Sequence, residues 1–122
     1  MVDVHDIRAS ARFVPMSAQK VRRVIDLVRG RQADEALEVL RFTPKAAARP
    51  VSKVLRSAIA NAEENFGVNR GDLVIHSISA DEAPTRRWRR FGARGRFKPI
   101  LRRSSHITVV LREHEAAASS AA

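Results

Sequence analysis

The residues with the clearest chemical character in this 122-residue chain lie in one basic segment, residues 86–103. The segment contains eight arginines, one lysine and no acidic residue. A guanidinium group is a planar fork of N–H donors that can bind a phosphate through two hydrogen bonds and can stack on a base. The nine bases are Arg86, Arg87, Arg89, Arg90, Arg94, Arg96, Lys98, Arg102 and Arg103. Their shared chemistry is the binding of a polyanion.

Aromatic and glycine residues are interleaved with these bases. Trp88, Phe91 and Phe97 are three of the six aromatic residues of the chain, and Gly92 and Gly95 lie among them. Aromatic rings offer flat faces to unstacked bases, and glycines let a backbone approach closely. The combination favours nucleic acid over two plainer interpretations, a solvated charge run and a polybasic strip for anionic lipid.

The net charge of the chain is concentrated in the same segment. The chain has 23 Lys and Arg and 13 Asp and Glu, which gives a formal net charge of +10 at pH 7. Outside residues 86–103, the fourteen remaining bases nearly balance the thirteen acids. A block of like charges repels itself and has little that could form a core, so we expect it to project into solvent unless a polyanion neutralises it.

Catalytic and metal-binding patterns are weak by comparison. The four histidines are scattered, the acidic pairs Glu63-Glu64 and Asp81-Glu82 need not converge, and cysteine is absent. We therefore predict no enzyme activity, no metal or other cofactor and no small-molecule substrate. His106 opens a predicted strand, where a hydrogen bond or a phosphate contact is expected of it.

The composition predicts one globular domain. Apolar residues make up 44% of the chain and charged residues 30%, which permits a buried core. No apolar run approaches the eighteen or so residues of a membrane span, and Met1–Asp6 carries acids where a secretory signal would carry lysines. These features, with the lack of cysteine, fit a cytoplasmic protein that does not bind a membrane.

The pattern of apolar residues predicts three helices. Ser17 is a good N-cap for a first helix that ends at Gly30, and a second helix fits Ala33–Arg41. Thr43-Pro44 predicts the start of a third helix that runs to about Phe66. Pro50 falls inside this span and predicts either a kink near Ala47 or a true start near Pro50.

Three segments predict strands, and two of them can form a hairpin around the basic segment. Ile7–Val14 is an expected edge strand, and Leu73–Ala80 and His106–Arg112 have the branched residues typical of strands. If the last two pair, residues 83–104 form a hairpin with arms of eleven residues, which could reach about 35 Å beyond the body. The predicted fold is α+β, with three helices packed on a small antiparallel sheet and a long protruding β-hairpin. Residues 1–112 would form the domain, and 113–122 a flexible tail.

Two helix faces carry further polar residues that could contact nucleic acid. They are Lys20, Arg22, Arg23 and Arg29 on the first helix, and Lys53, Ser57, Asn61 and Asn65 on the third. An ordinary solvated surface is the alternative interpretation for both faces.

Three motifs together carry a resemblance to a known family. They are Ser17–Arg22 with Asp26–Gly30, Lys53–Glu63, and Ala93–Arg96 with Ser105–Val110. In this order they resemble the universal large-subunit ribosomal protein L twenty-two family in its bacterial form, and the match covers about residues 7–112.

The resemblance implies a structural, rRNA-binding protein of the cytoplasmic ribosome. Its partners would be large-subunit rRNA, neighbouring large-subunit proteins and the nascent peptide near the hairpin tip. The hairpin would line the peptide exit tunnel, with Arg94-Gly95-Arg96 near its tip, and the protein would link rRNA domains during assembly. The expected rRNA-binding residues are Lys20, Arg22, Arg23, Lys53, Ser57, Asn61, Arg86, Arg87, Trp88, Arg89, Arg90, Arg94, Gly95, Arg96, Lys98, Arg102, Arg103 and His106.

A second functional class fits the same basic finger. A free DNA-architectural or RNA-chaperone protein would insert such a finger into a groove and act away from the ribosome. One long finger on a nearly neutral body, with no evident dimer interface, favours the ribosomal interpretation.

Overall fold

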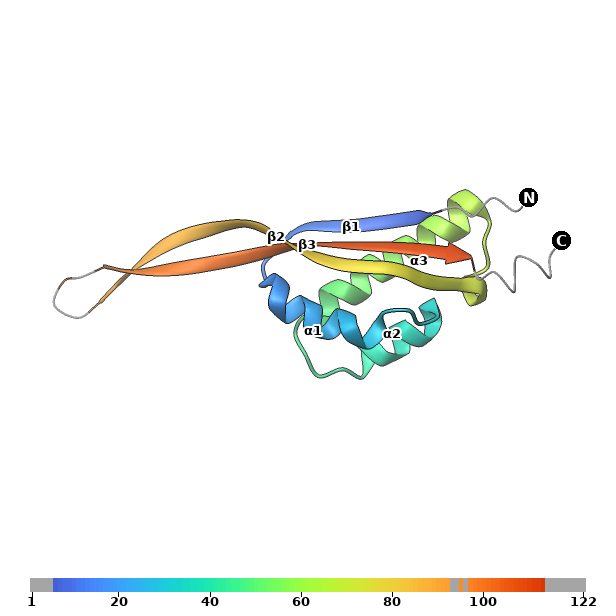
Figure 1. Ribbon diagram of the computed structural model, residues 1–122, viewed down its shortest axis with the longest axis horizontal. Coiled ribbons are helices and arrows are strands. Elements are labelled where there is room, and N and C mark those ends of the chain that lie inside the picture. The colour runs from blue at the N-terminus through green and yellow to red at the C-terminus, as the bar shows by residue number, and fades with distance from the viewer. Residues whose placement is uncertain (1–5, 93–94, 96, 114–122) are drawn as a thin grey trace.

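A computed structural model describes residues 6–92, 95 and 97–113 of the chain. Its sheet is antiparallel and three-stranded, with the order β1-β3-β2. The strands are β1 (Ile7–Val14), β2 (Leu73–Phe91) and β3 (Phe97–Glu113). β1 is an edge strand, as predicted, and the α+β class with a protruding hairpin is confirmed (Figure 1).

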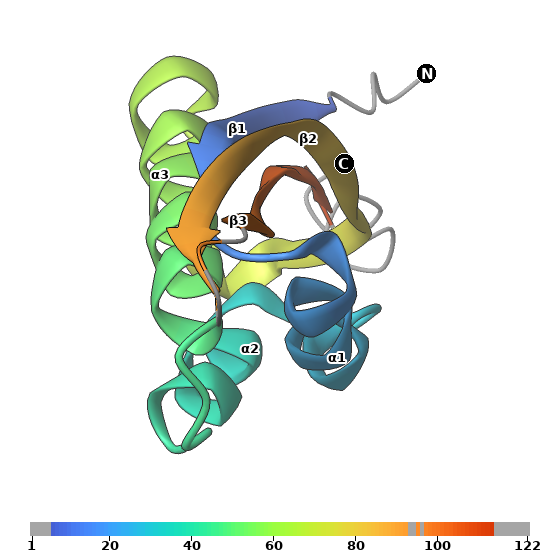
Figure 2. The same cartoon turned by 90° about the vertical axis from the view of Figure 1, so that its left-hand side faces the viewer.

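Three helices pack against this sheet and enclose the core with it. They are α1 (Ala18–Val28), α2 (Ala33–Arg41) and α3 (Ala48–Phe66). α3 contacts β1 and β3, α1 contacts β2, and α2 contacts α3. Figure 2 shows α3 beside the curved sheet, with α1 and α2 below it. The core consists mainly of aliphatic side chains on the inner faces of these elements, such as Val24, Leu55, Ile75 and Ile107.

The ends of α1 follow the sequence prediction. The Ser17 hydroxyl accepts a hydrogen bond from the backbone N–H of Lys20 at 3.4 Å, which caps the first turn. Gly30 has a φ of +78°, a left-handed conformation that costs little without a side chain. The apolar residues that recur at helical spacing along α3 (Val51, Val54, Leu55, Ala58 and Ala62) are all buried.

The start of α3 was predicted wrongly from Thr43-Pro44. The helix begins at Ala48, and residues 43–47 form an irregular connection with a short-range bond from Lys45 N to Thr43 O at 2.9 Å. Pro50 is therefore the third residue of the helix, where a backbone N–H has no partner within the helix. The proline costs no helical hydrogen bond there, so the alternative of a start near Pro50 is confirmed.

The hairpin strands are longer than the two predicted strand cores. β2 and β3 pair from Leu73 opposite Glu113 to Phe91 opposite Phe97, without leaving the sheet. A register shift lies between Ala83 and Arg86, at the root of the hairpin, where the Ser104 hydroxyl donates to Pro84 O at 3.2 Å. The distal part of the hairpin extends well beyond the helices (Figure 1). At the predicted turn, Gly95 has a φ of +71°.

Candidate nucleic-acid interface

Two pairs of bases in the hairpin lie directly opposite one another in the strand pairing. Arg86 pairs with Arg102, and Arg90 pairs with Lys98. Like charges in directly opposite positions destabilise a sheet. The hairpin is thus built with a repulsion that an anion between or around its strands would relieve.

The bases also occupy both faces of the hairpin. Arg86 and Arg87 are successive residues of β2, and their side chains point to opposite faces because side-chain direction alternates along a strand. Both are exposed, as are Arg102 and Arg103 on β3. A flat anionic surface would meet only one of these faces, whereas a segment inserted between RNA strands would use both.

The remaining hairpin candidates are described by their backbones alone or lie outside the described residues. Trp88 is opposite Ile100, Arg89 is opposite Pro99, and both strands are continuous there. The predicted contacts Arg94 and Arg96 lie outside the described residues. Gly95 between them is described and exposed.

The basic face of α1 is partly used within the protein. Arg22 Nε donates to the backbone carbonyl of Ala80 at 3.0 Å, and Arg29 Nη2 donates to that of Ile78 at 3.3 Å. Both carbonyls belong to β2, an edge strand whose outer backbone groups need partners. Arg22 therefore joins α1 to the sheet and keeps further N–H groups for another acceptor. Lys20 and Arg23 are exposed on the same helix.

The polar residues along α3 (Lys53, Ser57, Asn61 and Asn65) form a stripe, and part of this stripe is likewise used within the protein. Asn61 Nδ2 donates to the backbone carbonyl of Arg8 in β1 at 3.4 Å, and Asn65 Nδ2 donates to Asn61 Oδ1. These bonds tie the end of α3 to the edge strand. Lys53 and Ser57 lie earlier on the stripe and are exposed, so they are the members with a free surface.

His106 forms a hydrogen bond, one of the two roles expected of it, although it lies within β3 and does not open the strand as predicted. Its Nδ1 accepts from the backbone N–H of Phe13 at 3.1 Å, and the two rings meet edge to face with centroids 4.9 Å apart. Phe13 has a φ of +56° where β1 shifts register against β3. The histidine thus supports an irregular strand end, and a neutral ring there carries its proton on Nε2.

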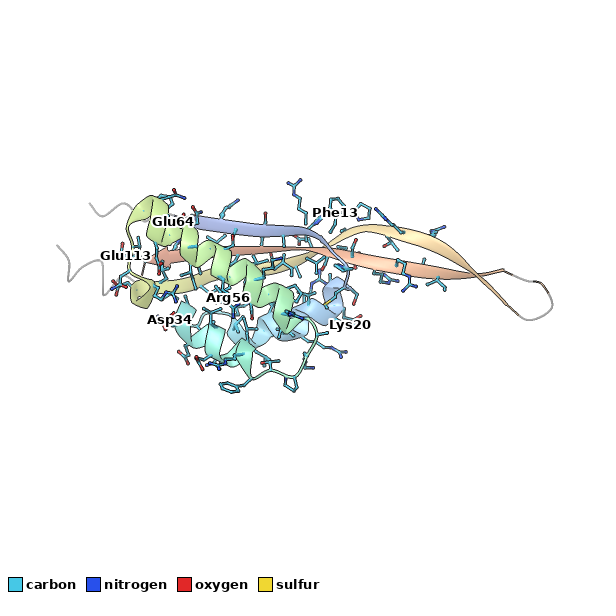
Figure 3. All side chains as sticks on the ribbon, turned by 180° about the vertical axis from the view of Figure 1, so that it is seen from behind. Phe13, Lys20, Asp34, Arg56, Glu64 and Glu113 are labelled. Carbon is cyan, nitrogen blue, oxygen red and sulfur yellow. The ribbon has the colours of Figure 1, made fainter. Side chains whose placement is uncertain are left out.

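The end of the body away from the hairpin is acidic. Figure 3 shows Asp34, Glu64 and Glu113 at this end, and Lys20 at the end near the hairpin. At the acidic end Arg70 forms ion pairs with Glu63 at 2.8 Å and with Asp34 at 4.0 Å, and the hydrogen bond to Glu63 raises the pKa of Arg70. Acidic residues at this end of the body therefore have arginine partners, whereas the opposite end of the body leads into the basic hairpin.

Metal-holding clusters and membrane-spanning helices are both absent from the residues that the structure describes. No group of three or more histidines and carboxylates there is placed to hold a metal ion. No helix of the described chain has the length and apolar character needed to span a bilayer.

The comparison with known proteins agrees with this geometry. The family profile described as "Ribosomal protein L22p/L17e" matches residues 9–112, which include the body and the whole hairpin. The chain belongs to this ribosomal protein family. Two relatives named "Large ribosomal subunit protein uL22" come from Thermoanaerobacter sp. (strain X514) and Thermoanaerobacter pseudethanolicus (strain ATCC 33223 / 39E). Each is 51% identical over 110 residues, which cover 90% of this chain and 99% of the relative. The resemblance drawn from the three motifs is confirmed, in its bacterial form.

Proposed function

We propose that this chain is a structural constituent of the large ribosomal subunit that binds large-subunit rRNA and has no catalytic step. The observation that carries the proposal is the hairpin with exposed arginines on both of its faces. Membership of the L22p/L17e family supports the ribosomal setting. Residues 1–112 would act as one rRNA-binding domain, and neighbouring large-subunit proteins would be its further partners.

The mechanism is neutralisation of charge between RNA segments that otherwise repel. Phosphates on both sides of the hairpin would pair with Arg86, Arg87, Arg102 and Arg103, which removes the repulsion within the hairpin at the same time. The hairpin would thereby link rRNA domains during assembly. Its tip, with Arg94-Gly95-Arg96, would contact the nascent peptide and line the exit tunnel, as in the family that the chain belongs to.

The body would anchor the hairpin through two separate faces. Lys20 and Arg23 are exposed on α1, and Lys53 and Ser57 are exposed on α3. α1 packs mainly on β2 and α3 mainly on β1, the two edge strands of the sheet, so their exposed faces can meet different RNA segments. Contacts of this kind position the protein without reading sequence.

Sucrose-gradient sedimentation of cell extracts tests the proposal against a chromosome-bound architectural protein. The tagged chain is expected to co-sediment with large subunits at physiological salt. A variant with Arg86, Arg87, Arg102 and Arg103 changed to alanine is expected to remain at the top of the gradient. A control that removes the same charge from exposed body positions is expected to co-sediment; it carries alanine at Arg8, Arg12, Arg31 and Arg41. Association of the unmodified chain with DNA and not with subunits would overturn the proposal.

A further inference from the structure

A groove of about 830 Å³ lies at the root of the hairpin, and residues of both the hairpin and the body line it. Three parts of the chain form its walls: residues 15–20 at the start of α1, residues 45–47 before α3, and both hairpin strands near their register shift. Its volume is in the range of pockets that hold a nucleotide-sized ligand. The groove is the place where the body and the hairpin meet.

The lining of the groove is strongly basic. Five basic residues line it, and Glu82 is the one acidic residue among the lining residues that the structure describes. The bases are Lys20, Arg23, Lys45, Arg102 and Arg103. α1 and α3 also begin at its edge, and the N-terminal ends of helices of this length carry partial positive charge. The groove therefore offers an anion several donors from separate elements.

The groove also has apolar lining, which a simple phosphate site would not need. Pro15, Met16, Ala46 and Leu101 line it, and Leu101 is 47% exposed although it is a large aliphatic residue. An RNA duplex presents phosphates and sugars and keeps its bases stacked inside. An unpaired nucleotide presents both a phosphate and an exposed base face, which matches a basic rim around an apolar wall.

We propose that this groove binds an unpaired nucleotide of the RNA strand, with its base against Leu101 and Met16 and its flanking phosphates on the basic rim. The inference rests on the proposed function and adds to it a specific site and a preference for single-stranded RNA. Lys45 is a member of the site that the sequence did not indicate, because residues 44–47 were expected to be helical. A nucleotide held here contacts the body and the hairpin together, and so fixes the direction of the hairpin.

Fluorescence anisotropy with the full-length chain tests this site. The probes are a labelled ten-nucleotide oligouridylate and a labelled, fully paired RNA duplex. Leu101→Ser is expected to weaken binding of the oligouridylate about five-fold and of the duplex by less than about two-fold, because only the single strand offers a base to the apolar wall. Lys45→Ala is expected to weaken oligouridylate binding about three-fold.

Two further variants serve as controls. Arg41→Ala removes the same charge as Lys45→Ala from an exposed position at the end of α2 outside the groove, and it is expected to change binding by less than about 1.5-fold. Leu101→Met keeps an apolar side chain on the hairpin and is expected to retain oligouridylate binding, which separates loss of contact from damage to the strand. Equal weakening of both RNAs by Leu101→Ser, or equal effects of Lys45→Ala and Arg41→Ala, would overturn the proposed groove site. Failure of the unmodified chain to bind either RNA would instead contradict the proposed function.

Discussion

The body of this protein pairs charges of opposite sign, whereas the distal hairpin places charges of the same sign opposite one another. In the body, ion pairs such as Arg70–Glu63 and Arg112–Asp6 join charges of opposite sign. In the hairpin, Arg86 and Arg102 occupy directly opposite positions. The body has a layer of aliphatic core beneath its charges, whereas the hairpin is a two-stranded ribbon beyond the helices (Figure 1).

This contrast separates what folds the protein from what binds its partner. A two-stranded ribbon alone is marginal in water, and directly opposed cations weaken it further. The hairpin is therefore expected to contribute little to folding stability. Contact with phosphate is expected to stabilise its opposed cations. Substitutions should fall into two classes, those that change RNA affinity and those that change the free energy of unfolding.

The largest expected effect is on RNA affinity, from alanine at Arg86, Arg87, Arg102 and Arg103. Loss of about four phosphate contacts should weaken binding to large-subunit rRNA by about 100- to 1,000-fold at physiological salt. The melting temperature of the free protein should stay nearly unchanged, because these side chains are exposed. Filter binding and thermal unfolding measure the two quantities. A large fall in melting temperature would show that the hairpin is part of the folding unit.

The converse substitution is Leu55→Ala in α3. Leu55 is 0% exposed in the core, so its truncation should lower the free energy of unfolding by about 3 kcal/mol. Below the unfolding transition, the affinity for rRNA should remain within about two-fold of the unmodified value. Urea unfolding and filter binding provide the measurements. If affinity fell as steeply as in the hairpin variant, the division between the two regions would be wrong.

A smaller effect on the body is expected from Gly67→Ala at the end of α3. Gly67 has a φ of +64° with open space around it, so an added methyl group is penalised by backbone conformation and not by a clash. The expected loss is about 1 kcal/mol of unfolding free energy. Gly71→Ala is the matched control, because Gly71 has the same open space without a positive φ. Equal stability of the two variants would contradict the assignment of Gly67 as a left-handed helix end.

The smallest expected effect concerns pH and the Asp6–Arg112 pair. The hydrogen bond from Arg112 lowers the pKa of Asp6, so the pair stabilises the fold above the ordinary carboxyl pKa of about 3.9. This contribution is lost as the pH falls through the lower pKa of the folded state. The melting temperatures of the unmodified chain and of Asp6→Asn should therefore converge between pH 6 and pH 2. A difference that stays constant over this range would show that the carboxylate charge has no role. The pair is exposed, which keeps the effect small.

The sequence predicted those parts of the fold that depend on local pattern. The apolar spacing of Val51, Val54 and Leu55, the Ser17 cap and the branched strand residues all led to the observed elements. Thr43-Pro44, a common helix start, was the wrong one of the two predicted starts of α3, because the chain before Ala48 closes short-range bonds and Pro50 fits the first turn. Local chemistry allowed both starts, and the sequence alone did not decide between them.

The sequence predicted the residues of the candidate site better than it predicted their contacts. Charge patterning located the basic segment, because its bases lie together in the sequence, and the strand patterns on either side placed it in a hairpin. The bonds of Arg22 to β2 and of Asn61 to β1 could not be predicted, since their partners are more than fifty positions away. Three segments form the groove, and they meet only in the folded chain. The residues next to Lys45 in the sequence do not mark it as a binding residue.

A salt titration of the binding between the full-length chain and large-subunit rRNA tests the central claim most directly. If the nine bases of the hairpin each meet a phosphate, a plot of log K against log salt concentration should have a slope with a magnitude of about 6–8. A slope near one would contradict the account, because it would leave the basic hairpin without the polyanion around which it is built.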